Sequence, residues 1–162
     1  MQKRRVVLDN SVVLPMFFKE EMKVAGDTFK ASRRAAPILT AIACGRVIGF
    51  APSILMFEFV KCAMRKALGP EITKRQIAEF RGLPLVYTEM NDLFEDALRM
   101  VEDYKVPSTD AWYAACAKQR DAELWILSPP KDKFVTAAAK ALPNKVFTLW
   151  ECEFSKPKPT KF

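Results

Sequence analysis

Three carboxylates occur in otherwise apolar segments, and they are the side chains with which this chain could do chemistry. Asp9 lies within Val-Val-Leu-Asp-Asn-Ser-Val-Val-Leu, Glu58 lies within Ile-Leu-Met-Phe-Glu-Phe-Val, and Asp110 begins Asp-Ala-Trp-Tyr-Ala-Ala-Cys-Ala. An isolated ionised carboxylate is costly in apolar surroundings unless it is paired or bound to a metal. The pattern therefore fits a shared acidic metal site. The structural alternatives are a turn at Asp9-Asn10, an acid near a helix cap behind Ser108 for Asp110, and a narrow polar helix face for Glu58.

The composition excludes several other chemistries. The 162 residues include no histidine, so a Ser-His-Asp or Cys-His pair and a histidine zinc site are impossible. The five glycines form neither a Gly-x-Gly-x-x-Gly pattern nor a P-loop, which argues against nucleotide cofactors. The four cysteines contain no Cys-x-x-Cys, and we interpret Cys44, Cys62 and Cys116 as buried thiols in a reducing compartment. The formal charge of +7 favours a polyanion such as nucleic acid or an anionic membrane surface.

Short apolar strands alternate with helices, which predicts an α/β domain with a mainly parallel sheet and helices on both faces. The expected strands are 5–8, 46–50, 83–87, 124–127 and 146–149. The expected helices are 11–18, 36–44, 54–68, 72–81, 91–104, 110–120 and 133–142, with Ser108 or Thr109 capping the helix at 110. The charged residues 20–35 are assigned no element before 36. Residues 1–150 form one domain in this interpretation, and 151–162 form a basic C-terminal tail, flexible from 155 onward.

The predicted topology gives a reason to bring the three acids together. Asp9 ends a strand at its carboxyl end, which is where α/β sheets build their sites. Glu58 lies in the helix after the next strand. Asp110 lies in the first turn of a later helix, where the positive helix end favours a negative charge. These positions predict one acidic site at the carboxyl edge of the sheet.

These motifs, in this order, resemble a PIN domain, and in particular a VapC-like ribonuclease toxin. The resemblance rests on a strand followed by Asp-x-Ser, then Ala-Pro-Ser-x-x-x-x-Glu, then Thr-Asp-Ala-x-Tyr-x-Ala-x-Ala, in segments 6–14, 50–61 and 108–118. The order of elements agrees from about residue 4 to residue 149. The resemblance implies a three-layer α/β/α PIN-like fold with a central, mainly parallel five-stranded sheet.

The resemblance also implies an endoribonuclease that hydrolyses RNA phosphodiester bonds with Mg²⁺ or Mn²⁺. Asp9, Glu58 and Asp110 would be the catalytic metal ligands, and hard divalent ions prefer such oxygen donors. Ser11 and Thr109 match hydroxyl positions near the family site and would support the ligands directly or through water.

The sequence departs from the family pattern at a fourth acid. PIN domains usually place an Asp, or sometimes Asn, after the strand that follows the helix of Asp110. That position is Ser128 here. Asp132 lies four residues further on, beyond two prolines that stiffen the loop. The alternative function is therefore a catalytically weakened PIN-like module that binds RNA or a protein, and a DNA-directed nuclease is a third reading.

The remaining expectations concern partners and location. Lys61 and Arg65 follow Glu58 on the same helix and could track an RNA backbone or simply be solvated. Trp112 and Tyr113 could stack on bases, although an apolar helix favours the core for both. The resemblance implies a small antitoxin over the site and a homodimer. The apolar run near the N-terminus is too short and too interrupted for a signal peptide or a membrane span, so we expect a cytoplasmic protein without membrane contact.

Overall fold

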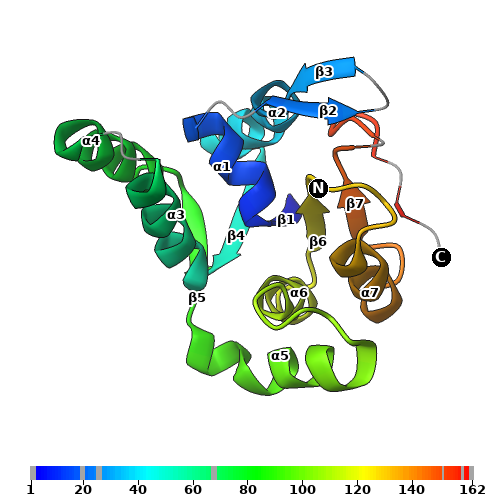
Figure 1. Cartoon of the computed structure of the whole chain (residues 1–162). Coiled ribbons are helices and arrows are strands. Elements are labelled where there is room, and N and C mark those ends of the chain that lie inside the picture. Colours follow the sequence, from blue (N-terminus) through cyan, green and yellow to red (C-terminus); the bar gives the residue numbers. More distant parts are fainter. Residues whose placement is uncertain are drawn as a thin grey trace.

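The structure is a computed structural model that describes residues 3–18, 21–24, 27–66, 69–150, 152–157 and 159–160. Its centre is a five-stranded sheet with the strand order β5-β4-β1-β6-β7, in which every neighbouring pair is parallel (Figure 1). The strands are β1 (Arg4–Leu8), β4 (Val47–Pro52), β5 (Leu85–Thr88), β6 (Glu123–Ile126) and β7 (Val146–Thr148). The expected α/β fold with a parallel sheet is confirmed, and all five expected strands are present.

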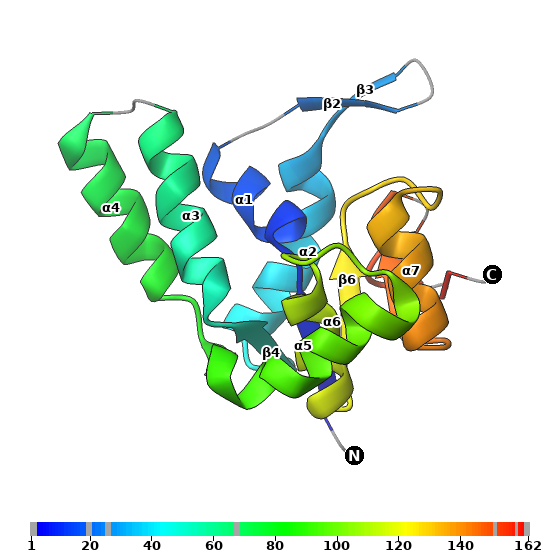
Figure 2. The ribbon, with the colours of Figure 1, turned by 60° about the horizontal axis from the view of Figure 1, so that its bottom comes forward.

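Helices cover both faces of this sheet. They are α1 (Asn10–Phe18), α2 (Ala31–Ala43), α3 (Ile54–Arg65), α4 (Pro70–Arg81), α5 (Met90–Tyr104), α6 (Ala111–Gln119) and α7 (Lys133–Ala141). On one face α1 and α2 pack against β1, β4 and β6, and α3 packs against α1. On the other face α6 packs against the same three strands, with α5 outside it and α7 over β7 (Figures 1 and 2). These are the three layers that the alternating pattern predicts.

The amphipathic pattern of α5 illustrates why these segments are helical. Its buried residues Leu93, Ala97 and Met100 repeat at spacings of three and four, so that one face meets the core. Lys105 follows in the left-handed conformation with φ of 60° and ends the helix. The expected helix 91–104 is therefore confirmed almost to the residue.

One segment differs from the expectation. Residues 20–35 contain two short antiparallel strands, β2 (Glu21–Val24) and β3 (Asp27–Lys30), and the first turn of α2. The helix begins at Ala31 instead of 36 because Ala31, Ala35 and Ile38 already bury one side of it. The sequence interpretation missed the two strands and the first turn of α2 because this segment is rich in charged residues.

The chain after residue 150 is anchored to the domain where the structure describes it. Phe154 is buried, and its ring packs edge-on against Trp125. The Arg4 guanidinium lies over the Phe154 ring and donates to the Phe154 carbonyl, and the Thr160 amide donates to the Val146 carbonyl of β7. Phe154 precedes the segment expected to be flexible, and within that segment Thr160 is hydrogen-bonded to β7. Positions 151, 158, 161 and 162 of the expected tail, and 67–68 of the expected helix 54–68, lie outside the described residues.

Two further expectations concern the cysteines and the membrane. The four cysteines are all free thiols, and Cys116 is buried as expected. The expectation of burial is wrong for Cys44, which is exposed after the last turn of α2, and Cys62 is only partly buried. Within the described ranges, no helix combines the length and the apolar character that a bilayer crossing requires.

Candidate metal-binding active site

The candidate site lies at the carboxyl edge of the sheet, where the strand order reverses. From β1 the chain proceeds to β4 and β5 on one side, and it then returns to place β6 and β7 on the other side of β1. In open parallel sheets, ligands bind in the crevice at such a reversal. Asp9 directly follows β1, and Ser128 follows β6 by two residues.

Asp9 is a buried acid with one oxygen engaged and one without a partner. Its side chain is only 4% exposed. Oδ2 accepts hydrogen bonds from the Ser11 amide at 3.0 Å and from the Ser11 hydroxyl, whereas Oδ1 is buried and meets no donor in the described part of the chain. Burial raises the pKa of Asp9 to about 6; the Ser11 hydrogen bonds lower it, and the Glu58 charge raises it further.

Ser11 connects the start of α1 to the end of β6. Its hydroxyl donates to Asp9 Oδ2 and accepts from the Leu127 amide at 2.9 Å. The Asp9 amide in turn donates to the Trp125 carbonyl at 3.0 Å. The Asp9 carboxylate is thus held against the ends of two neighbouring strands, with the Ser11 hydroxyl bridging Asp9 and the Leu127 amide.

Glu58 projects from α3 and is held by a residue of α6. The Tyr113 hydroxyl donates a hydrogen bond to Glu58 Oε2, although 55 residues separate the two in sequence. Tyr113 is fully buried, and burial together with the charges of Asp9 and Glu58 raises the pKa of its hydroxyl, which keeps the proton on the donor. Tyr113 is therefore a core residue that cannot stack on a base, and its contact with Glu58 was not anticipated from the sequence.

Asp110 stands immediately before α6 as its N-cap residue, half-buried. The pKa of its carboxyl is raised to about 7. Burial is the largest cause, and the negative charges of Asp9, Glu58 and Asp132 raise the pKa further. The expectation that Ser108 or Thr109 caps this helix is wrong: both are exposed, and Asp110 occupies the cap position without a side-chain capping bond.

The two residues considered for the fourth acid have structural contacts. Asp132 is the N-cap of α7, and its Oδ1 accepts from the Phe134 amide at 2.8 Å. Its charge nevertheless reaches Asp110 and raises the pKa of that carboxyl. The backbone carbonyl of Ser128 accepts from the Thr148 hydroxyl, which joins the end of β6 to the end of β7.

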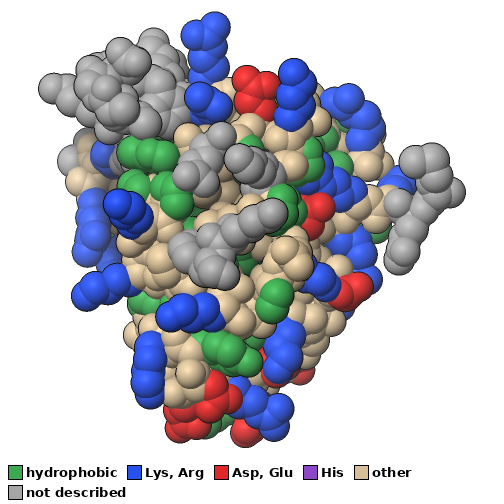
Figure 3. Space-filling view, turned by 90° about the vertical axis from the view of Figure 1, so that its right-hand side faces the viewer, with side chains coloured by type: hydrophobic (Ala, Val, Ile, Leu, Met, Phe, Trp, Pro, Cys, Tyr) green, Lys and Arg blue, Asp and Glu red, His purple; other side chains and the backbone are tan. Residues whose placement is uncertain are grey.

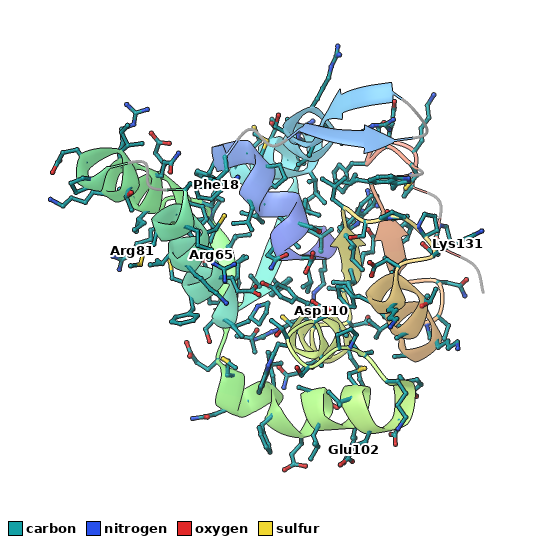
Figure 4. The ribbon with its side chains drawn as sticks, viewed as in Figure 1. Phe18, Arg65, Arg81, Glu102, Asp110 and Lys131 are labelled. Atoms are coloured by element: carbon teal, nitrogen blue, oxygen red, sulfur yellow. The ribbon has the colours of Figure 1, made fainter. Side chains whose placement is uncertain are left out.

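Four acids thus lie close enough for their charges to shift the pKa of Asp9 or Asp110, but they do not form a set of metal ligands: Asp9, Glu58, Asp110 and Asp132. Among the residues described, no three Asp, Glu or Cys side chains form a group that could hold a metal ion as they stand. Two observations nevertheless fit a divalent cation: the donors are carboxylate oxygens, and Asp9 Oδ1 is buried without a hydrogen bond. Figure 4 shows Asp110 at the start of α6, facing the centre of the molecule between α3 and α7.

Lys61 and Arg65 lie further along α3 from Glu58, and both are exposed. They follow Glu58 at spacings of three and seven residues, which places them on one side of the helix. The structure therefore allows both to meet a ligand that passes along α3.

Fold and site together define an α/β protein with an acidic cluster at the carboxyl edge of a parallel sheet. Solved structures with this fold include a toxin-antitoxin complex from Klebsiella pneumoniae, with a TM-score of 0.60 and 17% identity over 89% of this chain and 97% of that chain. Another is a structure of FitAB bound to an IR36 DNA fragment, with a TM-score of 0.58 and 16% identity over 91% of this chain and 97% of that chain. These similarities establish the fold. No protein-family model and no curated protein matches the sequence.

Proposed function

We propose that this chain is a PIN-like, Mg²⁺- or Mn²⁺-dependent endoribonuclease and the toxin of a toxin-antitoxin pair. The observation that carries the proposal is Asp9, a buried acid at the strand-order reversal whose Oδ1 has no hydrogen-bond partner among the described residues. The charge of Glu58 raises the pKa of Asp9, and the charges of Asp9 and Glu58 raise the pKa of Asp110, so the three carboxylates lie near one another. Carboxylates in this situation are stabilised by a cation.

The proposed ligands are Asp9, Glu58 and Asp110. A bound Mg²⁺ or Mn²⁺ would supply Lewis-acid chemistry, polarising a phosphate and lowering the pKa of water. Ser11 would fix the Asp9 carboxylate through Oδ2 and leave Oδ1 for the ligand. Tyr113 would orient Glu58 through its hydroxyl. Because these side chains do not form a ligand set as they stand, the proposal requires Asp110, which makes no side-chain capping bond, to turn toward Asp9 and Glu58 on binding.

The proposed partner is a small antitoxin, and the proposed assembly is a homodimer. Support for the antitoxin comes from the two structures that share the fold, one described as a toxin-antitoxin complex and the other as FitAB bound to DNA. The homodimer rests on the sequence resemblance alone. The net charge of +7 supports an RNA substrate.

A cleavage assay tests the nuclease proposal. The purified chain is incubated with mixed RNAs in Mn²⁺, in Mg²⁺ and in chelator, beside the variants Asp9→Asn and Asp110→Asn. We expect cleavage only with metal, and loss of cleavage in both variants with the fold retained. Asp103→Asn is the matched control, because Asp103 is an exposed acid on α5. Cleavage that persists in chelator, or in both site variants, would overturn the proposal.

A specific observation favours the second candidate, a binding module with weakened catalysis. Ser128 stands where the family pattern has an acid, and Asp132 is engaged as a helix cap. If metal loading is the defect, Ser128→Asp creates or raises metal-dependent cleavage. If the wild type already cleaves as fast as Ser128→Asp, this second candidate fails.

A further inference from the structure

One side of α3 forms an exposed surface next to the candidate site. The helix buries Leu55, Phe59 and Ala63, at spacings of four, against the rest of the molecule. The residues on the opposite side are exposed, and we call this set the α3 outer face: Phe57, Lys61, Met64 and Arg65. Positions separated by four, seven and eight residues lie on one face of a helix, so the set forms a continuous ridge about 12 Å long.

The α3 outer face combines an exposed aromatic ring with two cations. Phe57 is 71% exposed, as is Met64, although large apolar side chains are usually buried. Phe57 immediately precedes Glu58, and Lys61 lies one turn further along. The ring, the proposed ligand Glu58 and the cations thus occur in sequence along one helix, whose Arg65 is labelled in Figure 4.

The helix beneath this surface is firmly held. The Phe59 ring stacks on Phe80 of α4 with centroids 4.1 Å apart, and it meets Phe17 of α1 edge-on at 4.9 Å. Figure 2 shows α3 between α1 and α4. A ring presented from such a fixed helix needs little ordering on binding.

The distribution of charge does not by itself locate a nucleic-acid surface. Lys and Arg side chains are scattered over the face of the molecule seen in Figure 3, on the side of α7, and are not gathered there into one patch. The α3 outer face differs because its cations alternate with exposed apolar side chains. Cations with an exposed aromatic ring are the combination that single-stranded nucleic acid binds, with phosphates on the cations and an unpaired base on the ring.

We propose that the α3 outer face binds single-stranded RNA, with Phe57 stacking on an unpaired base beside the cleavage site and Lys61 and Arg65 contacting the following phosphates. The inference rests on the proposed function in taking RNA as the substrate. It replaces Trp112 and Tyr113 as candidate stacking residues, because Tyr113 is fully buried and Trp112 packs against Phe94. A duplex does not offer an unpaired base, so Phe57 selects for single strands.

Binding is measured without cleavage, so that the two proposals are tested separately. Fluorescence anisotropy follows a labelled single-stranded RNA of about 12 nucleotides, in chelator, with Asp9→Asn as the parent chain. Phe57→Leu keeps an apolar side chain but removes the aromatic face, and Phe57→Trp restores one. We expect Phe57→Leu to weaken single-strand binding roughly tenfold and Phe57→Trp to bind as the parent does. Phe94→Leu, on α5 and 53% exposed, is the matched control and should have no effect.

Salt dependence and duplex RNA distinguish stacking from charge. Lys61→Gln and Arg65→Gln should each reduce the slope of log affinity against log salt by about 0.7, whereas Phe57→Leu should leave that slope unchanged. Phe57→Leu should bind perfect duplex RNA as well as its parent does. Unchanged single-strand affinity in Phe57→Leu, or an equal loss on duplex, overturns the inference and leaves a protein partner as the occupant of the face.

The outcomes also separate this inference from the nuclease proposal. If single-strand binding depends on Phe57 while the wild type cleaves nothing in Mn²⁺, the nuclease proposal fails and the RNA surface stands. If Phe57→Leu, made in the chain that retains Asp9, cleaves with wild-type KM and kcat, the RNA surface fails and the nuclease proposal stands.

Discussion

The stability of Asp9→Asn relative to the wild type should increase as the pH rises. Burial raises the pKa of Asp9 from 3.8 to about 6 in the folded chain. A folded-state pKa above the unfolded value favours the fold at low pH, and this contribution is lost as the pH rises through about 6. The Asn side chain does not titrate, so the free energy of unfolding of the variant does not fall in this way as the pH rises.

The magnitude follows from the size of the shift. A displacement of about two pKa units corresponds to about 3 kcal/mol between fully protonated and fully ionised Asp9. At about pH 4.5 the unfolded carboxyl is already mostly ionised, so about 2 kcal/mol of this contribution remains to be lost by about pH 8. The free energy of unfolding of Asp9→Asn minus that of the wild type should therefore rise by about 2 kcal/mol between these two pH values.

Urea denaturation at both pH values, in the presence of chelator, measures this difference, because urea leaves the ionic strength unchanged. Comparing two pH values cancels the pH-independent effects of the amide, including an amide nitrogen placed where Oδ1 has no partner. Asp103→Asn, at an exposed position of α5, should show no comparable change between the two pH values. An Asp9→Asn difference that is the same at both pH values would refute the account of Asp9 as a destabilised buried acid.

Three further predictions concern the metal, the residue that holds Glu58, and the anchored end of the chain. Mn²⁺ at 100 times its dissociation constant should stabilise the wild type at about pH 8 by about 2.7 kcal/mol and Asp9→Asn by much less, as measured by urea denaturation; equal stabilisation of both would exclude Asp9 as a ligand. Tyr113→Phe should weaken Mn²⁺ affinity about 10-fold or more, measured by calorimetry, because Glu58 loses its donor; unchanged affinity would mean that Tyr113 does not position Glu58. Phe154→Ala should lower the free energy of unfolding by about 3 kcal/mol through lost packing on Trp125, whereas Lys156→Ala, at an exposed position, should change it little; a neutral Phe154→Ala would show that the chain end contributes nothing to the fold.

The elements that position the site were predictable because local signals agree with the tertiary structure. Asp9 follows a short apolar run rich in β-branched residues, which favours a strand, and the spacing of Leu93, Ala97 and Met100 favours a helix with one buried face. Strand ends and helix starts then place the acids at the carboxyl edge of a parallel sheet. The four carboxylates that influence one another electrostatically are those named from the sequence.

The contacts that hold the acids were not predictable in this way. The bond from Tyr113 to Glu58 depends on how α6 and α3 are placed around the sheet, which no local pattern encodes. Asp132 illustrates the same limit, because a single residue can be a helix cap and still act on Asp110 through its charge. The anchoring of Phe154 by Arg4 joins the two ends of the chain, where a basic, proline-containing composition indicated only a tail.

The energetics of the acidic cluster favour a cation over a purely structural or binding role. Asp9 is buried, and one of its carboxylate oxygens has no hydrogen-bond partner among the described residues. The charge of Glu58 raises the pKa of both Asp9 and Asp110, and the charge of Asp132 raises that of Asp110. In a protein that only bound RNA through Lys61, Arg65 and Phe57, these carboxylates would repel the phosphates that the cations attract. A divalent cation removes both costs, since it stabilises the buried acids and supplies positive charge to the RNA. The proposed metal-dependent nuclease gives a reason for an acidic cluster beside a cationic and aromatic helix face, and the proposed binding module does not. The response of RNA affinity to Mn²⁺ distinguishes the two proposals. Affinity of the wild-type chain for an RNA analogue that cannot be hydrolysed should rise when Mn²⁺ is added if the cluster binds the cation, and it should stay constant if Lys61 and Arg65 alone hold the RNA.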